Sequence, residues 1–193
     1  NATVSFSVPQ ALAVAERVER ALARRREAGL GNEGINPVCT IMVGRLDDWL
    51  KHVAARDGAE LDPAALNYAG VACAKKAYAL YREKAYRTRL LIAAFRLPCH
   101  WTEFIGGDLS LTIPHKYQTE FNNAHIEVTA HIQEPVSAAY LKDLERLPDF
   151  RKAYGDMTVE EFDGFGPVNK TLEQFAQGYD DLVRIVRSFQ FQY

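Results

Sequence analysis

Two arginines each come directly after a predicted strand. Arg45 follows the apolar segment 38–43 and a glycine, and Arg96 follows the segment 89–95. Because reactive groups of parallel α/β folds collect at the carboxyl ends of the strands, we expect both guanidiniums to reach the same edge of the sheet. Two planar guanidiniums that converge bind a phosphate through bidentate, charge-assisted hydrogen bonds. The pattern therefore predicts a clamp for a small phosphate.

Other polar residues lie in or next to the predicted strands. The same rule selects Asn1 and Thr3 in the first strand, and His115 and Lys116 after the fourth. Thr40 stands inside an otherwise apolar strand, so its hydroxyl either serves a ligand or finds a hydrogen-bond partner within the core. Lys116 could reach the carboxyl ends of the strands as a nucleophile. A solvated lysine in the first turn of a helix is the simpler interpretation.

Several familiar catalytic arrangements are absent from the sequence. The five histidines show no HExxH motif and no spacing typical of metal ligands, and neither a GxSxG elbow nor a P-loop occurs. Acidic pairs such as Asp47–Asp48 are typical of solvated faces. The three cysteines, without a CxxC pair, are too few for a disulfide framework, so we expect reduced, buried thiols at Cys39, Cys73 and Cys99. The sequence therefore predicts no metal site.

The composition is that of a soluble globular chain. Of 193 residues, 48% are hydrophobic and 25% are charged, and 23 basic against 25 acidic side chains give a net charge of -2. Because no basic excess is present to neutralise a polyphosphate backbone, we expect no nucleic-acid partner. No apolar run approaches the about 20 residues that a membrane helix needs. Together with reduced thiols, these features predict a cytoplasmic protein without a membrane partner.

Short β-type runs alternate with longer helical ones. Strands are predicted at residues 2–8, 38–43, 89–95 and 109–113. Helices are predicted at 10–28, 45–56, 62–84 and 101–105, with a glycine-rich loop at 29–37, and then at 136–147, 158–161 and 171–189. The pattern indicates one domain, with strand–helix units over residues 1–114 and mainly helices over 115–193.

Strands that alternate with helices imply a parallel sheet with right-handed crossovers. Four such units form either half of an eight-stranded barrel or a small open sheet. An open-sheet nucleotide binder usually has a glycine-rich turn after its first strand, whereas Val8, Pro9 and Gln10 follow here, so the pattern favours the barrel. Because a strand is already under way at the first residues, we expect the chain to be the back part of a longer protein.

Four segments, in order along the chain, resemble the transaldolase family. The segment from Asn1 to Ser7, with Gln10-Ala11 after it, is similar to the family's fifth strand and following helix. Thr40 to Arg45 with Asp48-Trp49, Ala93 to Arg96, and Gly107-Asp108 with Leu111 to Pro114 are similar to the sixth, seventh and eighth strands. The resemblance covers nearly the whole chain. It implies a TIM-type (β/α)8 barrel, of which this chain carries about the second half plus C-terminal helices.

The resemblance also implies an activity for the complete enzyme, a class I transferase of the pentose phosphate pathway. A lysine forms a Schiff base with a ketose phosphate and transfers a dihydroxyacetone unit to an aldose phosphate, without metal or organic cofactor. Asn1 and Thr3 would hydrogen-bond the bound intermediate or the catalytic water, and Thr40, Arg45 and Arg96 would hold the substrate phosphate. The family's Schiff-base lysine and its acid–base carboxylates lie on earlier strands, so we expect none in this chain, with Lys116 as the outside candidate.

Departures from the family pattern leave alternatives open. Ile41 replaces a proline, Ala94 replaces a serine, and residues 29–37 resemble an insertion. The chain could therefore be an aldolase acting on another phosphorylated or sulfonated sugar, or a sugar-phosphate-binding module without catalysis. An unrelated scaffold would not bring Arg45 and Arg96 together.

A half barrel would expose the edges of its outer strands, which natural sheets rarely leave open. We therefore expect those edges to be covered in one of three ways. The front half of the barrel would belong to the same polypeptide or to a separate chain, or a second copy of this chain would pair as a homo-oligomer.

Overall fold

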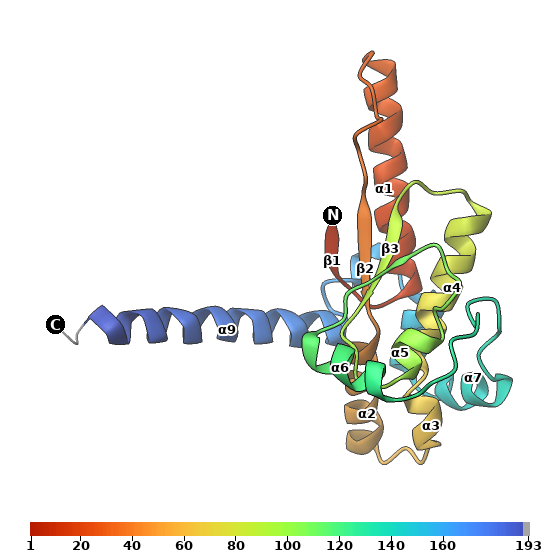
Figure 1. Cartoon of the computed structure of the whole chain (residues 1–193), viewed down its shortest axis with the longest axis vertical. Helices are drawn as coiled ribbons and strands as arrows, with labels where there is room; N and C mark the ends of the chain where they lie inside the picture. Colours follow the sequence, from red (N-terminus) through yellow and green to blue (C-terminus); the bar gives the residue numbers. More distant parts are fainter. Residues whose placement is uncertain (191–193) are drawn as a thin grey trace.

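The computed structural model describes residues 1–190 and contains a four-stranded parallel sheet at its centre (Figure 1). Its strands lie side by side in chain order: β1 (Ala2–Ser5), β2 (Val38–Met42), β3 (Arg89–Ala93) and β4 (Ser110–Leu111). Each pair is parallel, so the carboxyl ends of all four strands lie at one edge. The predicted α/β architecture with a parallel sheet is confirmed.

The central strands show why these residues form a sheet covered by helices. Cys39 and Ile41 of β2 pair with Leu90 and Ile92 of β3, and all four side chains are buried in the apolar core. Side chains alternate between the two faces of a strand, so Thr40 points to the opposite face. The helices α1 (Val8–Glu27) and α4 (Ala69–Glu83) pack against β2 from the core side.

The first helix begins earlier than the sequence suggested. Ser7 is the N-cap of α1: its hydroxyl accepts a hydrogen bond from Gln10 N at 3.2 Å, and the Gln10 side chain accepts one from Phe6 N. This reciprocal arrangement resembles a capping box, and Pro9 occupies the first turn, where its missing N–H costs nothing. The predicted strand over residues 2–8 therefore ends at Ser5.

Several other boundaries differ from the predictions. The helix expected over 62–84 is two helices, α3 (Pro63–Leu66) and α4, with a break at Asn67 and Tyr68. The strand expected over 109–113 is reduced to the two residues of β4, and the last helix is longer than expected. The remaining elements are α2 (Val43–Asp57), α5 (Cys99–Thr102), α6 (His115–Asn123), α7 (Ala138–Leu144), α8 (Pro148–Arg151), η1 (Lys152–Asp156), η2 (Val159–Glu161) and α9 (Gly166–Gln190).

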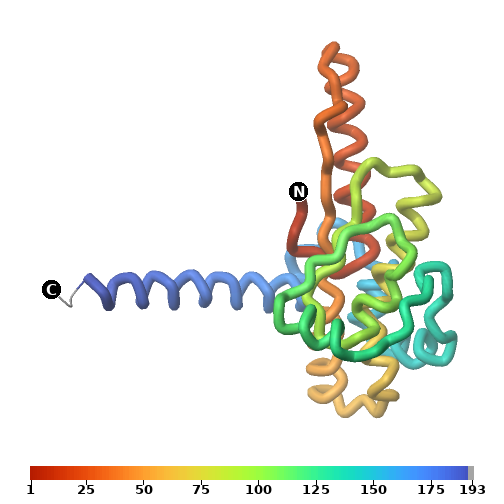
Figure 2. Tube along the Cα trace, in the orientation of Figure 1, coloured from red at the N-terminus to blue at the C-terminus, as the bar shows by residue number. Residues whose placement is uncertain are grey.

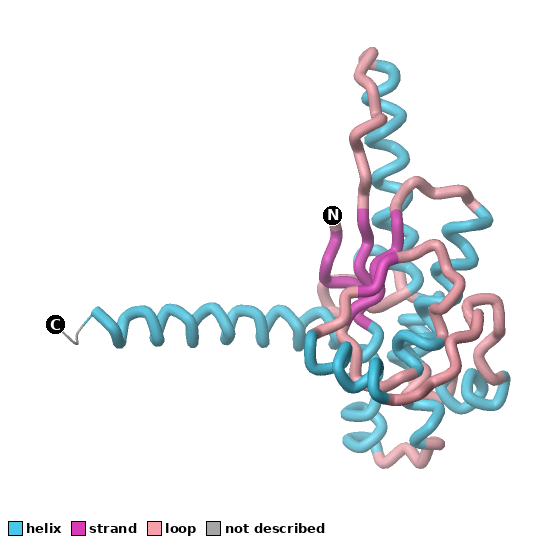
Figure 3. The backbone as a smooth tube through the Cα atoms, viewed as in Figure 1, coloured by secondary structure: helices cyan, strands magenta, loops and turns pink. Residues whose placement is uncertain are grey.

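Two segments extend away from this body. The end of α1 and the returning glycine-rich chain 29–37 form an arm beyond the sheet, and α9 projects past the β1 edge (Figure 2). Within residues 1–190, β1 and β4 lie at the two ends of the strand order and each pair on one side only. Figure 3 colours the strands of this sheet magenta. No helix in that part of the chain is both long enough and apolar enough to cross a membrane.

The three thiols are shielded. Cys39 and Cys73 are buried, and Cys99 is half-buried. Burial raises the pKa of Cys99 to about 12, with the neighbouring Asp47 and Glu103 charges adding to the effect. Burial also raises the pKa of Cys39 and of Cys73. Reduced, unreactive thiols are the expected state.

We therefore expect iodoacetamide at about pH 8 to alkylate all three thiols more than about 100-fold more slowly in the folded protein than in denaturant, because the thiolate is the reactive form. Intact mass against time measures both rates. A Cys99 that reacts equally fast in both states would contradict the shielding described above.

Candidate anion-binding site

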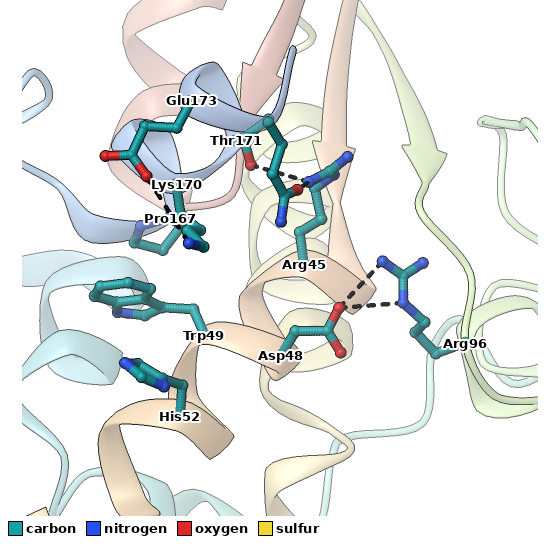
Figure 4. A pocket seen from close by; sticks show the side chains of 10 residues that line it. Arg45, Asp48, Trp49, His52, Arg96, Pro167, Lys170, Thr171 and Glu173 are labelled. Atoms are coloured by element: carbon teal, nitrogen blue, oxygen red, sulfur yellow. Dashed lines mark hydrogen bonds and ion pairs between the residues drawn. The ribbon is translucent and has the colours of Figure 1, made fainter. Parts of the chain in front are cut away.

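A pocket of about 550 Å³ opens where α2, the turn after β3 and the start of α9 meet (Figure 4). Arg45 and Arg96 both line it, so the two arginines that follow strands lie at one pocket. This placement is the opposite of what an unrelated scaffold predicts. The other lining residues are Asp48, Trp49 and His52 from α2, and Pro167, Lys170, Thr171, Glu173 and Gln174 from α9.

Arg45 is held by α9 on one side. Its Nη1 donates to Gln174 Oε1 and lies 3.5 Å from Thr171 Oγ1, and its guanidinium stands over the Phe175 ring at 5.3 Å from the centroid. Burial lowers the pKa of Arg45, the positive charge of Arg96 lowers it further, and the Asp48 carboxylate opposes both effects. A bound anion would relieve the repulsion between the two guanidiniums.

Arg96 is held by α2. Its Nε and Nη2 both lie 3.1 Å from Asp48 Oδ2, and its Nη1 donates to Phe95 O at 2.9 Å. Figure 4 shows the Asp48 carboxylate reaching from α2 to the Arg96 guanidinium. Asp48 orients the guanidinium and balances part of its charge. Among the lining residues, three basic side chains (Arg45, Arg96 and Lys170) face two acidic ones, so a net positive charge remains for an anion.

A close backbone approach sets the distance between the two arginines. Gly44 N, at the start of α2, donates to Ala94 O at 3.1 Å. A Cβ on Gly44 would lie 2.1 Å from that oxygen and 2.8 Å from Arg96 Cγ, so no larger residue fits there without movement. Ala94 adopts φ of +64°, which turns the chain sharply after β3. The residues between β2 and Arg45 thus lie directly against those between β3 and Arg96.

A buried acid–imidazole pair lies beneath the pocket. Asp47 Oδ2 is 2.8 Å from His100 Nε2, and both side chains are almost fully buried. Asp47 Oδ1 accepts from Gly70 N at 2.7 Å, and His100 Nδ1 accepts from Arg96 N at 3.0 Å. The prediction that Asp47 and Asp48 form a solvated acidic face is therefore wrong for Asp47, and Asp48 is engaged by Arg96.

The other predicted site residues do not line this pocket. Asn1 precedes β1 at the amino edge, where its Oδ1 accepts from Val38 N at 3.0 Å. The expectation that Asn1 lies at the carboxyl ends of the strands is therefore wrong, because a residue that precedes a parallel strand lies at the opposite edge. Thr3 lies within β1 with an exposed side chain, and Thr40 is nearly buried within β2.

Lys116 stands in the first turn of α6, as the simpler interpretation expects. Its side chain is 75% exposed and lies 3.9 Å from Glu120. Neither Lys116 nor His115 lines the pocket with the two arginines.

Sequence reasoning missed the contributions of α9 and of Asp48. Lys170, Thr171 and Gln174 reach the pocket from more than 120 residues away in the chain, as the Arg45 pairs with Thr171 and Gln174 show, and no local signal marks them. Asp48 carries a detectable signal. It lies one helical turn after Arg45, so the two share one face of α2.

The described part of the chain contains no group of three His, Cys, Asp or Glu side chains that could hold a metal ion. The pocket, as far as residues 1–190 define it, presents two guanidiniums, the Lys170 ammonium and the Asp48 carboxylate that pairs with Arg96.

Comparison with protein-family models gives a match over residues 1–184, which is nearly the whole chain. The matching family is described as Transaldolase/Fructose-6-phosphate aldolase, a TIM-barrel family. The match agrees with the parallel α/β sheet. The chain thus belongs to the transaldolase/fructose-6-phosphate aldolase family.

Proposed function

We propose that the chain is the phosphate-binding half of a transaldolase-type barrel, comprising its strands five to eight and C-terminal helices. In this proposal Arg45 and Arg96 hold the phosphate of a ketose phosphate, and a lysine outside the chain forms the Schiff base. The observation that carries the proposal is that both arginines line one pocket of a chain from this family.

The chemistry of the pocket suits a phosphate ester. Each guanidinium offers parallel N–H donors to two phosphate oxygens, and a dianion bound between them offsets their repulsion. Asp48 keeps Arg96 turned toward the pocket, and Lys170 adds a third positive charge. The sugar would extend from the phosphate along the face of the sheet that carries the nearly buried Thr40. The Thr40 hydroxyl would donate a further hydrogen bond to the phosphate.

The reaction would begin with attack of the lysine amine on the ketose carbonyl. Water leaves as the imine forms, the imine accepts the electron pair of the carbon–carbon bond that breaks, and an aldose phosphate departs. The three-carbon unit then bonds to a second aldose phosphate, and water hydrolyses the imine to restore the lysine. Thr3, within β1, would hydrogen-bond that intermediate or the water that releases it. Lys170 is the one lysine of the described residues at the pocket, and its side chain is 60% exposed beside Glu173.

The exposed surfaces support the front half of the barrel as the partner. The outer edge of β1 is unpaired within residues 1–190. An apolar groove of about 490 Å³ runs beside β1 and is lined by Val4, Val14, Val18 and Phe162, among others. Exposed apolar side chains also follow one stripe of α9: Leu172, Phe175, Tyr179, Leu182, Val186 and Phe189. A front half of the barrel that paired with β1 beneath α9 would cover the unpaired edge of β1, the apolar groove beside it and the apolar stripe of α9 together.

A second candidate function is a sugar-phosphate-binding module without catalysis. The same pocket favours this second function, because both arginines line it and no buried lysine lies beside them among the described residues. The two functions differ in whether a lysine-bearing strand completes the protein.

Borohydride trapping with fructose 6-phosphate tests the proposal. For the chain alone, at 21.7 kDa, we expect saturable binding of the sugar phosphate and no covalent adduct by intact mass. Completed by the front half of the barrel, the protein should gain one adduct on a lysine of that half. An adduct on Lys116 would overturn the assignment of the lysine, and a completed protein without an adduct would favour the binding module. A light-scattering mass of twice 21.7 kDa would show a second copy as the partner instead.

A further inference from the structure

We propose that Asp47 and His100 form a positioning pair that fixes Arg96 opposite Arg45. The proposed function gives these two residues no role. The inference rests on that function only in assuming that Arg45 and Arg96 bind a phosphate. Neither side chain touches the pocket, and both are almost completely buried.

The hydrogen bonds fix the protonation pattern of the imidazole. His100 Nδ1 accepts from Arg96 N at 3.0 Å, so this nitrogen carries no proton. Nε2 therefore holds the proton and donates it to Asp47 Oδ2 at 2.8 Å. Both nitrogens of a fully buried ring are thus satisfied, and the ring has one orientation.

The carboxylate of Asp47 is held as firmly as the imidazole. Its second oxygen accepts from Gly70 N at 2.7 Å, in the first turn of α4. The positive end of the α4 dipole therefore lies against the buried negative charge. A Cβ on Gly70 would lie 2.3 Å from Val43 O, so α4 and α2 are in backbone contact at this point.

These bonds connect the two halves of the clamp. Asp47 lies on α2, two residues after Arg45 and next to Asp48, which holds the Arg96 side chain. His100 lies on α5 and holds the Arg96 backbone. The α2 helix therefore controls both ends of Arg96, through Asp48 at the guanidinium and through Asp47 and His100 at the peptide. Loss of the buried link should shift Arg96 without removing its charge.

Two substitutions of His100 separate positioning from general stability. The amide of His100→Gln reaches the Nε2 position, so this variant keeps the donor to Asp47 and loses the acceptor for Arg96 N. The carbonyl of His100→Asn reaches the Nδ1 position, so this variant keeps the acceptor for Arg96 N and loses the contact with Asp47. Each variant loses one of the two buried hydrogen bonds of His100, so each variant serves as the matched control for the other.

Calorimetric titration with inorganic phosphate gives the Kd of each variant, and thermal unfolding gives its stability. We expect both variants to lower Tm by similar amounts. We expect His100→Gln to raise the Kd for phosphate about tenfold and His100→Asn to raise it about threefold or less, the difference being the size of one hydrogen bond. Equal Kd values in the two variants would overturn the positioning role.

Arg96→Gln, measured in the same titration, separates failure of this inference from failure of the proposed function. If Arg96→Gln loses phosphate affinity and His100→Gln does not, the pair is structural only. If Arg96→Gln binds phosphate as the parent does, the clamp itself is wrong and the positioning role falls with it.

An NMR measurement of the His100 tautomer uses the parent protein, so it does not depend on the folding of a variant. The ¹⁵N spectrum of His100 should show Nδ1 as the unprotonated nitrogen, with a coupling across the hydrogen bond to Arg96 N. A proton on Nδ1 would overturn the proposal.

Discussion

Replacing Arg96 by glutamine should weaken the binding of fructose 6-phosphate about 30-fold, and replacing Arg45 in the same way should have an effect of similar size. A hydrogen bond to a charged group contributes about 1.5–3 kcal/mol, and about 2 kcal/mol corresponds to that factor. Glutamine keeps a polar side chain of intermediate length, so the loss reports the charge and the paired donors. Calorimetric titration at low ionic strength measures the change in Kd.

The double variant should show how the two arginines cooperate. In the free protein each guanidinium repels the other, which is one reason that the pKa of Arg45 is lowered. A single substitution removes that repulsion along with half of the clamp, whereas the double substitution removes all of the paired donors. We therefore expect no measurable phosphate binding in the double variant. Added salt should lower the phosphate affinity of the parent protein more than that of either single variant.

A matched control separates the clamp from net charge. Arg184 lies on α9, is 74% exposed, pairs with Asp181 at 3.0 Å and does not line the pocket. Arg184→Gln changes the net charge by the same amount as Arg96→Gln and should leave the Kd unchanged. If the control weakens binding as much as Arg96→Gln, the effect comes from the general field of the protein and the clamp is wrong.

The parallel sheet and the nearness of Arg45 to Arg96 could be predicted from the sequence for the same reason. Segments 38–43 and 89–95 are apolar nearly throughout, as buried parallel strands are, and a residue that follows a parallel strand must lie at its carboxyl edge. Arg45 and Arg96 therefore had to lie near one another once those two strands were neighbours, as they are. Placing these residues needed only local patterns and one rule of topology.

Predictions that depended on competition between local signals were less accurate. Phe6, Val8 and Pro9 are an aromatic residue, a β-branched residue and a proline, yet the cap formed by Ser7 and Gln10 starts a helix there. The helical pattern over residues 62–84 is continuous in sequence, but the chain breaks at Asn67 and Tyr68, directly before Gly70 of α4 packs against Val43. Periodicity within one segment indicates neither the Ser7 cap nor this break.

The remaining site residues depend on contacts between distant segments. Asp47 and Asp48 are adjacent in sequence, and the sequence predicts that both carboxylates are solvated. The first is buried because His100 and Gly70 provide its partners, 53 and 23 residues away. Lys170 and Gln174 enter the pocket because α9 returns across α2. No spacing rule within one helix could have revealed these partners.

Replacing Gly44 by alanine should lower the free energy of unfolding by about 2 kcal/mol, although alanine is the better helix former. The intrinsic preference would stabilise α2 by about 0.8–1 kcal/mol. The added Cβ, however, would lie 2.1 Å from Ala94 O, a backbone atom that cannot rotate away. Overpacking of this kind costs about 1–3 kcal/mol, and separating the segments also weakens the Gly44 N–Ala94 O hydrogen bond, worth about 1 kcal/mol. The clash should therefore outweigh the helix preference.

Gly178→Ala is the matched control, because Gly178 also lies within a helix, α9, and a Cβ there would have no atom within 4 Å. This variant should raise the free energy of unfolding by about 0.5–1 kcal/mol, since only the helix preference acts. Denaturant titration gives both values, and Gly44→Ala should lower Tm by about 4–8 °C. Because the clash also involves Arg96 Cγ at 2.8 Å, Gly44→Ala should weaken phosphate binding while Gly178→Ala leaves it unchanged. If both variants were stabilised equally, β2 and β3 would not meet as closely at their carboxyl ends as described, and the spacing of the two arginines would need another cause.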